Sequence, residues 1–183
     1  MTDQELLLAY EQSRDVESLG TFVERYQNPL LRFASRMLSD ETAAQDVVQE
    51  AFLRVARDPR RLLKVENCHN WLIRVVRNIC IDHIRKAVRQ RKAMKEMAAR
   101  TEEVAVTSPA AALEREETHA LVRQAIASLK PRYRELVILK VQEGKSYREI
   151  AEITGLSATN VGYLLHHAMK ALSHKLKGRE AVS

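Results

Sequence analysis

Apolar residues recur along most of the chain at intervals of three and four, the spacing that places them on one face of an α-helix. Residues 3 to 12 and 15 to 38 show this spacing, and so do the segments that follow Asp40 and Asn70. No alternating run of apolar and polar residues predicts a strand, and only 5 Gly and 4 Pro interrupt the helical pattern. The pattern therefore predicts an all-α protein.

One stretch, Ser146 to Leu172, combines the signals of two short helices joined by a tight turn. Ser146 followed by Glu149 is a capping box, which starts a helix. Gly155 can adopt the left-handed conformation that ends this helix, and Ser157 is a suitable N-cap for a second one. The alternative is an ordinary helical hairpin in a core, but the three signals in this order favour a helix-turn-helix.

The second of these helices has an apolar stripe for packing and a polar stripe on the opposite side. In a recognition helix, N-terminal polar side chains meet base edges in the major groove of DNA. The candidates for DNA contact on this helix are Ser157, Thr159, Asn160, Tyr163, His166, His167 and Lys170.

The helix predicted after Asp40 also has a polar face beside its apolar stripe. Such faces are usually only solvated, and residue chemistry alone favours that interpretation over a protein-binding surface. The residues of this face are Gln45, Asp46, Gln49 and Glu50.

An irregular basic stretch after Pro59 precedes the helix that begins at Asn70. From Arg74 to Arg100 there are nine Lys and Arg against two acidic residues, a net charge of +7. A basic helix after a polar loop can bind phosphates and accept an unstacked base. Trp71 could stack on a base, but a lone Trp at helical spacing is more often a core residue. The candidates here are Asn70, Trp71, Arg74, Arg77, Asn78, Asp82, Arg85 and Lys86.

The helical periodicity stops between residues 100 and 112, where Thr, Ser, Pro and small residues predict a flexible linker. The linker divides the chain into one small helical domain at residues 1–99 and another at 113–183. Pro131 stands at the first turn of a helix in the second domain, and the helix-turn-helix completes that domain.

Composition and the cysteine count also indicate the cellular compartment of the protein. The chain has 183 residues and a formal charge of +6, with the basic excess concentrated after Arg74. Its N-terminus lacks the features of a signal peptide, and no apolar run has transmembrane length, so no membrane insertion is expected. Cys68 and Cys80 are too few for a disulfide framework and fit a reducing compartment. These features together predict a cytoplasmic protein.

Three segments of the chain resemble those of the extracytoplasmic-function (ECF) sigma factors of bacterial RNA polymerase. AAQDVVQEAFLRV resembles the family's polymerase-binding helix, NWLIRVVRNICIDHIRK its promoter-melting segment, and SYREIAEITGLSATNVGYLLHHAMKAL its helix-turn-helix. The three occur in the family's order and are separated by the expected linker, so the likeness covers nearly the whole chain.

The resemblance implies a sigma factor that directs promoter-specific transcription initiation. Asp46, Gln49 and Glu50, with Gln45 beside them, would contact the clamp helices of the largest subunit of core RNA polymerase. In the first domain, the loop before Trp71, with Asn78 and the basic residues after it, would read and hold the melted minus-ten promoter element. The second would dock on the polymerase flap and read the minus-thirty-five element. Family members are often held inactive by an anti-sigma factor, which is a further expected partner.

The resemblance implies no catalytic residue and no cofactor, because the phosphoryl chemistry belongs to the polymerase. The recognition helix departs from the family, which usually carries several basic residues and an Arg-Ala pair there. Here the matching positions are Gly162, Tyr163, Leu164 and His167-Ala168. We therefore expect a weaker phosphate grip from this helix.

Two other functions are open on the sequence. The cadence PRYRELVILK followed by EIAEITGLS is similar to the C-terminal part of LuxR-type regulators, but the first hundred residues lack the alternating strands and helices of a receiver domain. A metal-dependent enzyme would need a site from Cys68, His69, Cys80 and His83. Adjacent Cys68 and His69 could not easily both face one ion, which disfavours this site.

Overall fold

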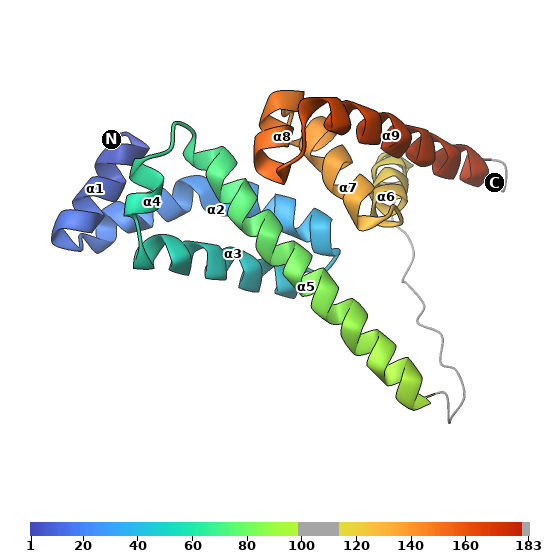
Figure 1. The fold of residues 1–183 in the computed structure, drawn as a ribbon, viewed down its shortest axis with the longest axis horizontal. Helices are drawn as coiled ribbons and strands as arrows, with labels where there is room; N and C mark the ends of the chain where they lie inside the picture. Colours follow the sequence, from blue (N-terminus) through green and yellow to red (C-terminus); the bar gives the residue numbers. More distant parts are fainter. Residues whose placement is uncertain (99–113, 181–183) are drawn as a thin grey trace.

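The computed structural model describes residues 1–98 and 114–180, and within these ranges the secondary structure is helical with no strand (Figure 1). This confirms the all-α prediction. The predicted linker at residues 100–112 lies outside the described residues. No helix in the described parts of the chain is both long and apolar enough to cross a membrane.

Five helices, α1 to α5, form the first bundle. Their bounds are α1 Asp3–Ser13, α2 Val16–Leu38, α3 Glu41–Arg57, α4 Arg60–Leu63 and α5 Cys68–Ala98. Side chains accept from backbone N–H groups at the starts of α1, α2, α3 and α5; in α3 the carboxylate of Asp40 accepts from the N–H of Ala43 at 3.0 Å. Helix α2 packs against α1, α3 and α5 and so forms the centre of the bundle.

The segment between Asp58 and Asn70 differs from the sequence prediction of an irregular stretch. It contains the short helix α4, and α5 begins at Cys68, two residues before Asn70. Asn67 caps α5, because its side-chain oxygen accepts from the N–H of Asn70 at 2.9 Å. The polar character of Asn67 marks a helix cap here rather than a continuing loop, so Asn70 lies in a helical first turn.

The second bundle contains α6 Glu114–Ala127, α7 Pro131–Val137, the π-helix η1 Ile138–Gln142, α8 Tyr147–Thr154 and α9 Ala158–Glu180. Its helix-turn-helix forms as predicted. Ser146 and Glu149 make both bonds of the capping box, and Gly155 ends α8 with φ of 75°. The hydroxyl of Ser157 accepts from the N–H of Asn160 at 3.2 Å, which starts α9.

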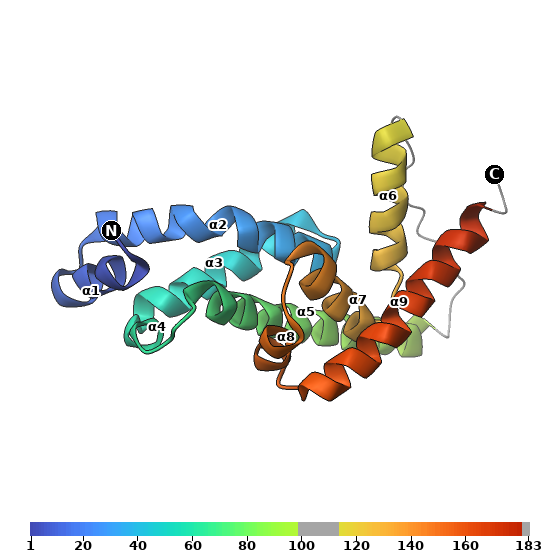
Figure 2. The same cartoon turned by 90° about the horizontal axis from the view of Figure 1, so that it is seen from above.

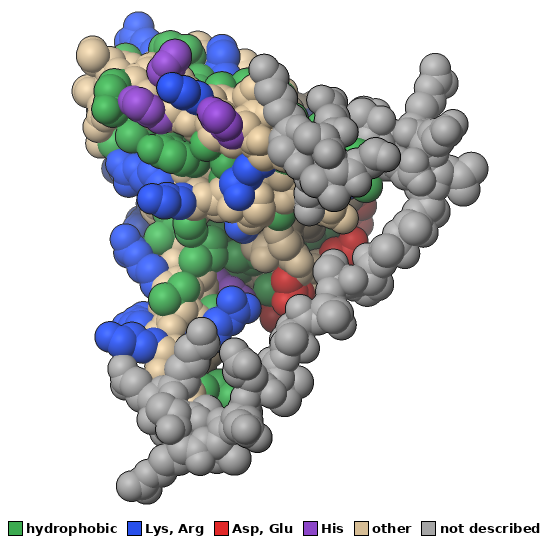
Figure 3. Space-filling model, turned by 90° about the vertical axis from the view of Figure 1, so that its right-hand side faces the viewer, with side chains coloured by type: hydrophobic (Ala, Val, Ile, Leu, Met, Phe, Trp, Pro, Cys, Tyr) green, Lys and Arg blue, Asp and Glu red, His purple; other side chains and the backbone are tan. Residues whose placement is uncertain are grey.

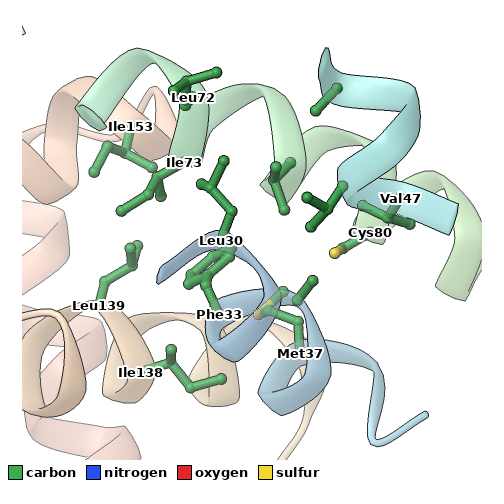
Figure 4. Close-up of a cluster of buried hydrophobic side chains, with 14 of the residues drawn as sticks. Leu30, Phe33, Met37, Val47, Leu72, Ile73, Cys80, Ile138, Leu139 and Ile153 are labelled. Carbon is green, nitrogen blue, oxygen red and sulfur yellow. The ribbon is translucent and has the colours of Figure 1, made fainter. Parts of the chain in front are cut away.

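The two bundles pack against each other through a continuous apolar core. Figure 4 shows Leu30 and Phe33 of α2 and Ile73 of α5 beside Ile138 and Leu139 of η1. All five side chains are fully buried. Seen from above, α7 and α8 lie against α2 and α5 (Figure 2). Beyond this contact the second half of α5 extends away from both bundles (Figure 1).

Candidate nucleic-acid and protein interface

The polar face of α3 lies on the surface, opposite the side on which α3 packs against α2 and α5. Gln45, Asp46 and Gln49 are exposed, and half-buried Glu50 forms an ion pair with Arg54 at 3.0 Å. The four predicted side chains therefore share one accessible face. Leu53 is 45% exposed on the same face, and the sequence analysis did not single it out. Its position four residues after Gln49 is the signal that could have identified it.

The basic helix α5 presents most of its predicted candidates to solvent. Arg74, Asn78, Asp82, Arg85 and Lys86 are all exposed, and Asp82 and Arg85 approach to 3.6 Å. Trp71 is half-buried and packs against the hydrophobic core. The structure therefore assigns the indole mainly to packing.

A cleft of about 1020 Å³ runs between α5, α7 and the end of α2. Its wall combines apolar side chains with four arginines and two acidic residues. The lining residues are Met37, Arg77, Asn78, Ile81, Asp82, Ile84, Arg85, Val88, Arg89, Pro131, Arg132 and Glu135. Candidate side chains for DNA contact, Arg77, Asn78, Asp82 and Arg85, thus line this cleft.

Two α5 candidates are engaged with the second bundle instead of being free. Arg77 Nε donates to Glu135 Oε1 at 2.5 Å, and Asn70 Nδ2 donates to Glu149 Oε1 at 3.1 Å. The sequence analysis did not single out Glu135 and assigned Glu149 only to a helix cap, because no local pattern relates these carboxylates to residues 58 and 79 positions earlier.

Glu149 is the most strongly perturbed carboxyl of this region. Hydrogen bonds to the ionised form, from the Ser146 N–H first and then from the Asn70 and Ser146 side chains, lower its pKa to about 2. Burial has the opposite effect on Glu143, whose pKa it raises despite the nearby Arg36 and Lys145. Glu143 Oε2 also lies 3.9 Å from His69 Nε2.

The polar stripe of α9 faces solvent at its N-terminal half. Ser157, Thr159 and Asn160 are exposed, and Tyr163 is 64% exposed. His166 and Lys170 are also exposed, whereas His167 is half-buried with its ring 4.5 Å from that of Tyr163 in an edge-on contact. Figure 3 shows histidine side chains beside Lys and Arg on the upper part of this face of the molecule, where the second bundle lies.

Gly162 accommodates a neighbouring side chain inside the protein. A Cβ at this position would lie 3.4 Å from Cε2 of Tyr147, so the aromatic ring packs directly on the backbone of the recognition helix. Lys140 Nζ lies 5.3 Å from the centre of the same ring. The ring of Tyr147, which is 44% exposed, thus lies at the edge of the recognition surface.

Among the described residues, no group of three or more His, Cys, Asp and Glu side chains is arranged to hold a metal ion. Cys68 and Cys80 are buried free thiols, and burial raises their pKa values to about 11 and about 12. Neither thiol is therefore activated as a nucleophile or ligand.

Two protein families match the chain. Residues 22–90, which include most of α2 and the exposed faces of α3 and α5, match Sigma-70 region 2. Residues 119–172, which include the helix-turn-helix, match Sigma-70 region 4. A LuxR-type regulator would not explain the first of these matches.

Curated relatives are similar over most of the chain. The ECF RNA polymerase sigma factor SigL of Mycobacterium tuberculosis is 31% identical over 145 residues, which cover 78% of this chain and 80% of SigL. The ECF sigma factor SigW of Bacillus subtilis is 28% identical over 171 residues, which cover 89% of this chain and 91% of SigW. SigI of M. tuberculosis, described as a probable ECF sigma factor, is 31% identical, and the chain spans only half its length.

Two solved structures share the fold. The sigma factor RpoE, crystallised with the anti-sigma factor NepR from Bartonella quintana, has a TM-score of 0.66 at 23% identity, with 86% of this chain and 96% of RpoE covered. CnrH in complex with the cytosolic domain of CnrY has a TM-score of 0.65 at 22% identity, with 96% and 97% covered.

Proposed function

The chain belongs to the ECF sigma factors of bacterial RNA polymerase, and we propose from this that it binds core polymerase and directs transcription from a specific set of promoters. The observation that carries the proposal is the pairing, in one chain, of an exposed polar face on α3 with an exposed recognition face on α9. One face suits a protein partner and the other suits DNA. The chain itself supplies no catalytic group in this proposal.

The polymerase contact is assigned to the exposed face of α3. Gln45, Asp46, Gln49 and Glu50 offer acidic and amide groups to the clamp helices of the largest subunit, with Leu53 as an apolar contact among them.

The minus-ten contact is assigned to residues 1–99, through α5. Arg74, Arg85 and Lys86 would neutralise phosphates, which gives affinity without sequence preference. Asn70 and Asn78 have amide groups that can pair with a base edge, which would give preference. Arg77 would join the phosphate contacts, Asp82 orients Arg85, and Trp71 supports the helix from its packed side.

The minus-thirty-five contact is assigned to residues 113–183, which would also dock on the polymerase flap. Thr159, Asn160 and Tyr163 stand at the start of α9, where a recognition helix meets base edges. Ser157, His166, His167 and Lys170 complete this surface. Because Lys170 is the one Lys or Arg among these candidates, we expect few charge-assisted phosphate contacts from this helix.

A protein inhibitor is also part of the proposal. RpoE was crystallised with an anti-sigma factor and CnrH with the cytosolic domain of CnrY, and the chain shares their fold. We expect an anti-sigma factor for this chain too. Because the proposed function takes place at promoters of the bacterial chromosome, it implies a cytoplasmic location.

Run-off transcription with core polymerase and a promoter library tests the function and the specificity together. We expect defined transcripts from a subset of promoters, and we expect Asn160→Ala to change that subset. Asn28→Ala, which removes the same group from an exposed position on α2, is the matched control and should leave the subset unchanged. Core polymerase that gives the same transcripts with and without the chain would contradict the proposal.

A further inference from the structure

Histidines stand beside a single lysine on the recognition face of α9. Lys170 is the one Lys or Arg among the candidates for DNA contact on this helix, whereas His166 and His167 both belong to them. From Ala158 to Arg179 the sequence of the helix contains no Asp or Glu. A proton taken up by an imidazole here has no carboxylate of α9 as a counterion, so a bound DNA phosphate can fill that role.

His166 is placed to share a phosphate with Lys170. Both side chains are exposed, and they lie four residues apart, which makes them neighbours on the helix surface. Within residues 1–98 and 114–180, neither side chain forms a hydrogen bond or an ion pair. A phosphate bound by Lys170 is therefore within reach of an imidazole whose polar atoms are free.

His167 is the less available of the two imidazoles. It is half-buried, and its ring meets that of Tyr163 edge-on with 4.5 Å between the centroids. The His166 ring lies 5.7 Å from the His167 ring, at an angle of 80°. Two positive charges this close repel each other, so the pair binds one proton more readily than two. Because burial disfavours a charged ring, exposed His166 is the one that receives the proton.

The carboxylates of the neighbouring helices have partners of their own. Helices α6, α7 and α8 pack against α9. Their described charged and titratable side chains are Arg123 of α6, Arg132, Tyr133, Arg134 and Glu135 of α7, and Tyr147, Arg148, Glu149 and Glu152 of α8. The acidic members pair elsewhere, Glu135 with Arg77, Glu149 with Lys145 and Glu152 with Arg148. Among the described side chains, none of these groups forms an ion pair with either imidazole.

We propose that His166 is a proton-dependent phosphate contact, so that the second bundle takes up one proton at this imidazole when it binds duplex promoter DNA. The inference rests on the proposed function, because it concerns the affinity of the minus-thirty-five surface. A neutral imidazole donates one hydrogen bond, whereas the protonated ring donates from both nitrogens and carries a full charge. Hydrogen bonds between ionised partners are the stronger ones, so the protonated ring is the form that holds the phosphate.

The direction of the pH dependence follows from this contact. Histidine is the side chain that changes charge between about pH 5 and pH 8, and an adjacent negative charge favours its charged form. The DNA complex therefore binds more protons than the free chain does. By linkage, the affinity of the chain for promoter DNA rises as the pH falls.

His166→Gln in the full-length chain tests the proposal, because glutamine keeps a hydrogen-bonding side chain that does not titrate. The matched control is His174→Gln, which removes an exposed imidazole farther along the same helix, outside the candidate contacts. The probe is a fluorescein-labelled duplex that carries the minus-thirty-five half of a promoter selected by run-off transcription. Fluorescence anisotropy between pH 6 and pH 8, at one ionic strength, measures the affinity.

We expect the wild type and His174→Gln to bind the duplex about fivefold more tightly at pH 6 than at pH 8, as one contact that raises proton affinity tenfold requires. The affinity of His166→Gln should change by less than about twofold over this range. A pH dependence that survives in His166→Gln would assign the proton to another group and overturn the proposal. Loss of the dependence in His174→Gln as well would also overturn it, since the effect would not be local to His166.

Nuclear magnetic resonance of the chain with 13C-labelled histidine supplies a second measurement, which reports on the ring itself. The signal of His166, identified by its absence from His166→Gln, should titrate about one pH unit higher when the duplex is bound. The signal of His174 should not move. An unchanged midpoint for His166 would overturn the proton-dependent contact even if affinity varies with pH.

The two proposals fail in different ways. Promoter-specific transcription together with pH-independent binding would leave the proposed function standing and remove the role of His166. The absence of promoter-specific transcription at every pH would overturn the proposed function, and the inference about His166 with it.

Discussion

Two neighbouring histidines on α9 have different environments. His166 is exposed, whereas His167 is half-buried with its ring against Tyr163. His167 thus helps to orient an aromatic side chain of the recognition surface, and His166 is the better placed of the two for a phosphate. Gly162 lies beside the ring of Tyr147, where a Cβ would be 3.4 Å from Cε2.

At the residue scale we predict that His166→Arg tightens binding to duplex promoter DNA. A permanent charge at an exposed position adds one charge-assisted phosphate contact, which contributes about 1 kcal/mol, or roughly fivefold in affinity. The salt slope of log K should steepen by about one. Fluorescence anisotropy at two salt concentrations measures both quantities. His174→Arg is the control, since it adds the same charge farther along α9, and equal tightening there would show that the effect is not local.

Among the helices, stability depends on a few capping groups at each end, whereas the candidate contacts lie on one exposed face. The start of α8 depends on Ser146 and Glu149, which satisfy each other's backbone N–H groups. Helix α3 has buried alanines and valines on one side and the polar candidates on the other. Capping and surface charge can therefore be changed separately from the core.

We predict that Ser146→Ala lowers the free energy of unfolding by about 1 kcal/mol, the usual effect of losing a serine cap.

The stability that Glu149 contributes to this cap should also depend on pH. Since hydrogen bonding lowers the pKa of Glu149 from 4.5 to about 2, the stability it contributes is complete above pH 4.5 and is lost as the pH falls toward 2. In urea titrations, the difference between the wild type and Glu149→Gln should narrow from pH 6 to pH 3. A constant difference would mean that the ionised carboxylate is not what stabilises the cap.

For α3 we predict that Asp46→Lys combined with Glu50→Lys abolishes binding to core polymerase while the helical circular dichroism is retained. Exposed substitutions rarely unfold a domain, but two reversed charges at an interface repel the partner. Co-purification with core polymerase measures binding. Glu17→Lys combined with Glu24→Lys reverses two exposed carboxylates on α2 and should bind normally. Normal binding by the α3 variant would refute the assignment of this face.

At the scale of the whole molecule, the two bundles share one hydrophobic core and a seam of polar contacts. Arg134 connects the two bundles, since its guanidinium donates to backbone carbonyls of its own bundle and to the carbonyl of Met37 in the first. Burial lowers the pKa of Arg134 from its usual value. Within residues 1–98 and 114–180, the hydrogen-bond acceptors of this cation are backbone carbonyls.

We predict that Arg134→Lys lowers the free energy of unfolding of the full chain by about 1–3 kcal/mol, because an ammonium cannot reach all three carbonyls and leaves buried acceptors unpaired. Arg132→Lys, at an exposed neighbouring position, should change it by less than about 0.5 kcal/mol. Urea denaturation of both variants makes the comparison. Equal effects would show that the carbonyl contacts add nothing to stability.

The helices and the helix-turn-helix were predictable from the sequence, because the responsible interactions connect residues close together in the chain. Asp40 caps α3 three residues ahead, and Ser146, Glu149, Gly155 and Ser157 each act within one turn. Helical spacing also separated the buried side of α3 from its exposed face. The start of α5 was the local miss, since an asparagine is equally common in turns and at helix caps.

Which candidate side chains contact the second bundle depends on the tertiary structure. Arg77 and Asn78 are neighbours with similar local patterns, yet Arg77 is paired with Glu135 and Asn78 remains exposed. The same holds for Asn70, whose partner Glu149 also serves as a local cap. Periodicity and capping carry no information about the packing of one bundle on another, because that packing depends on shape and charge complementarity between segments far apart in the chain.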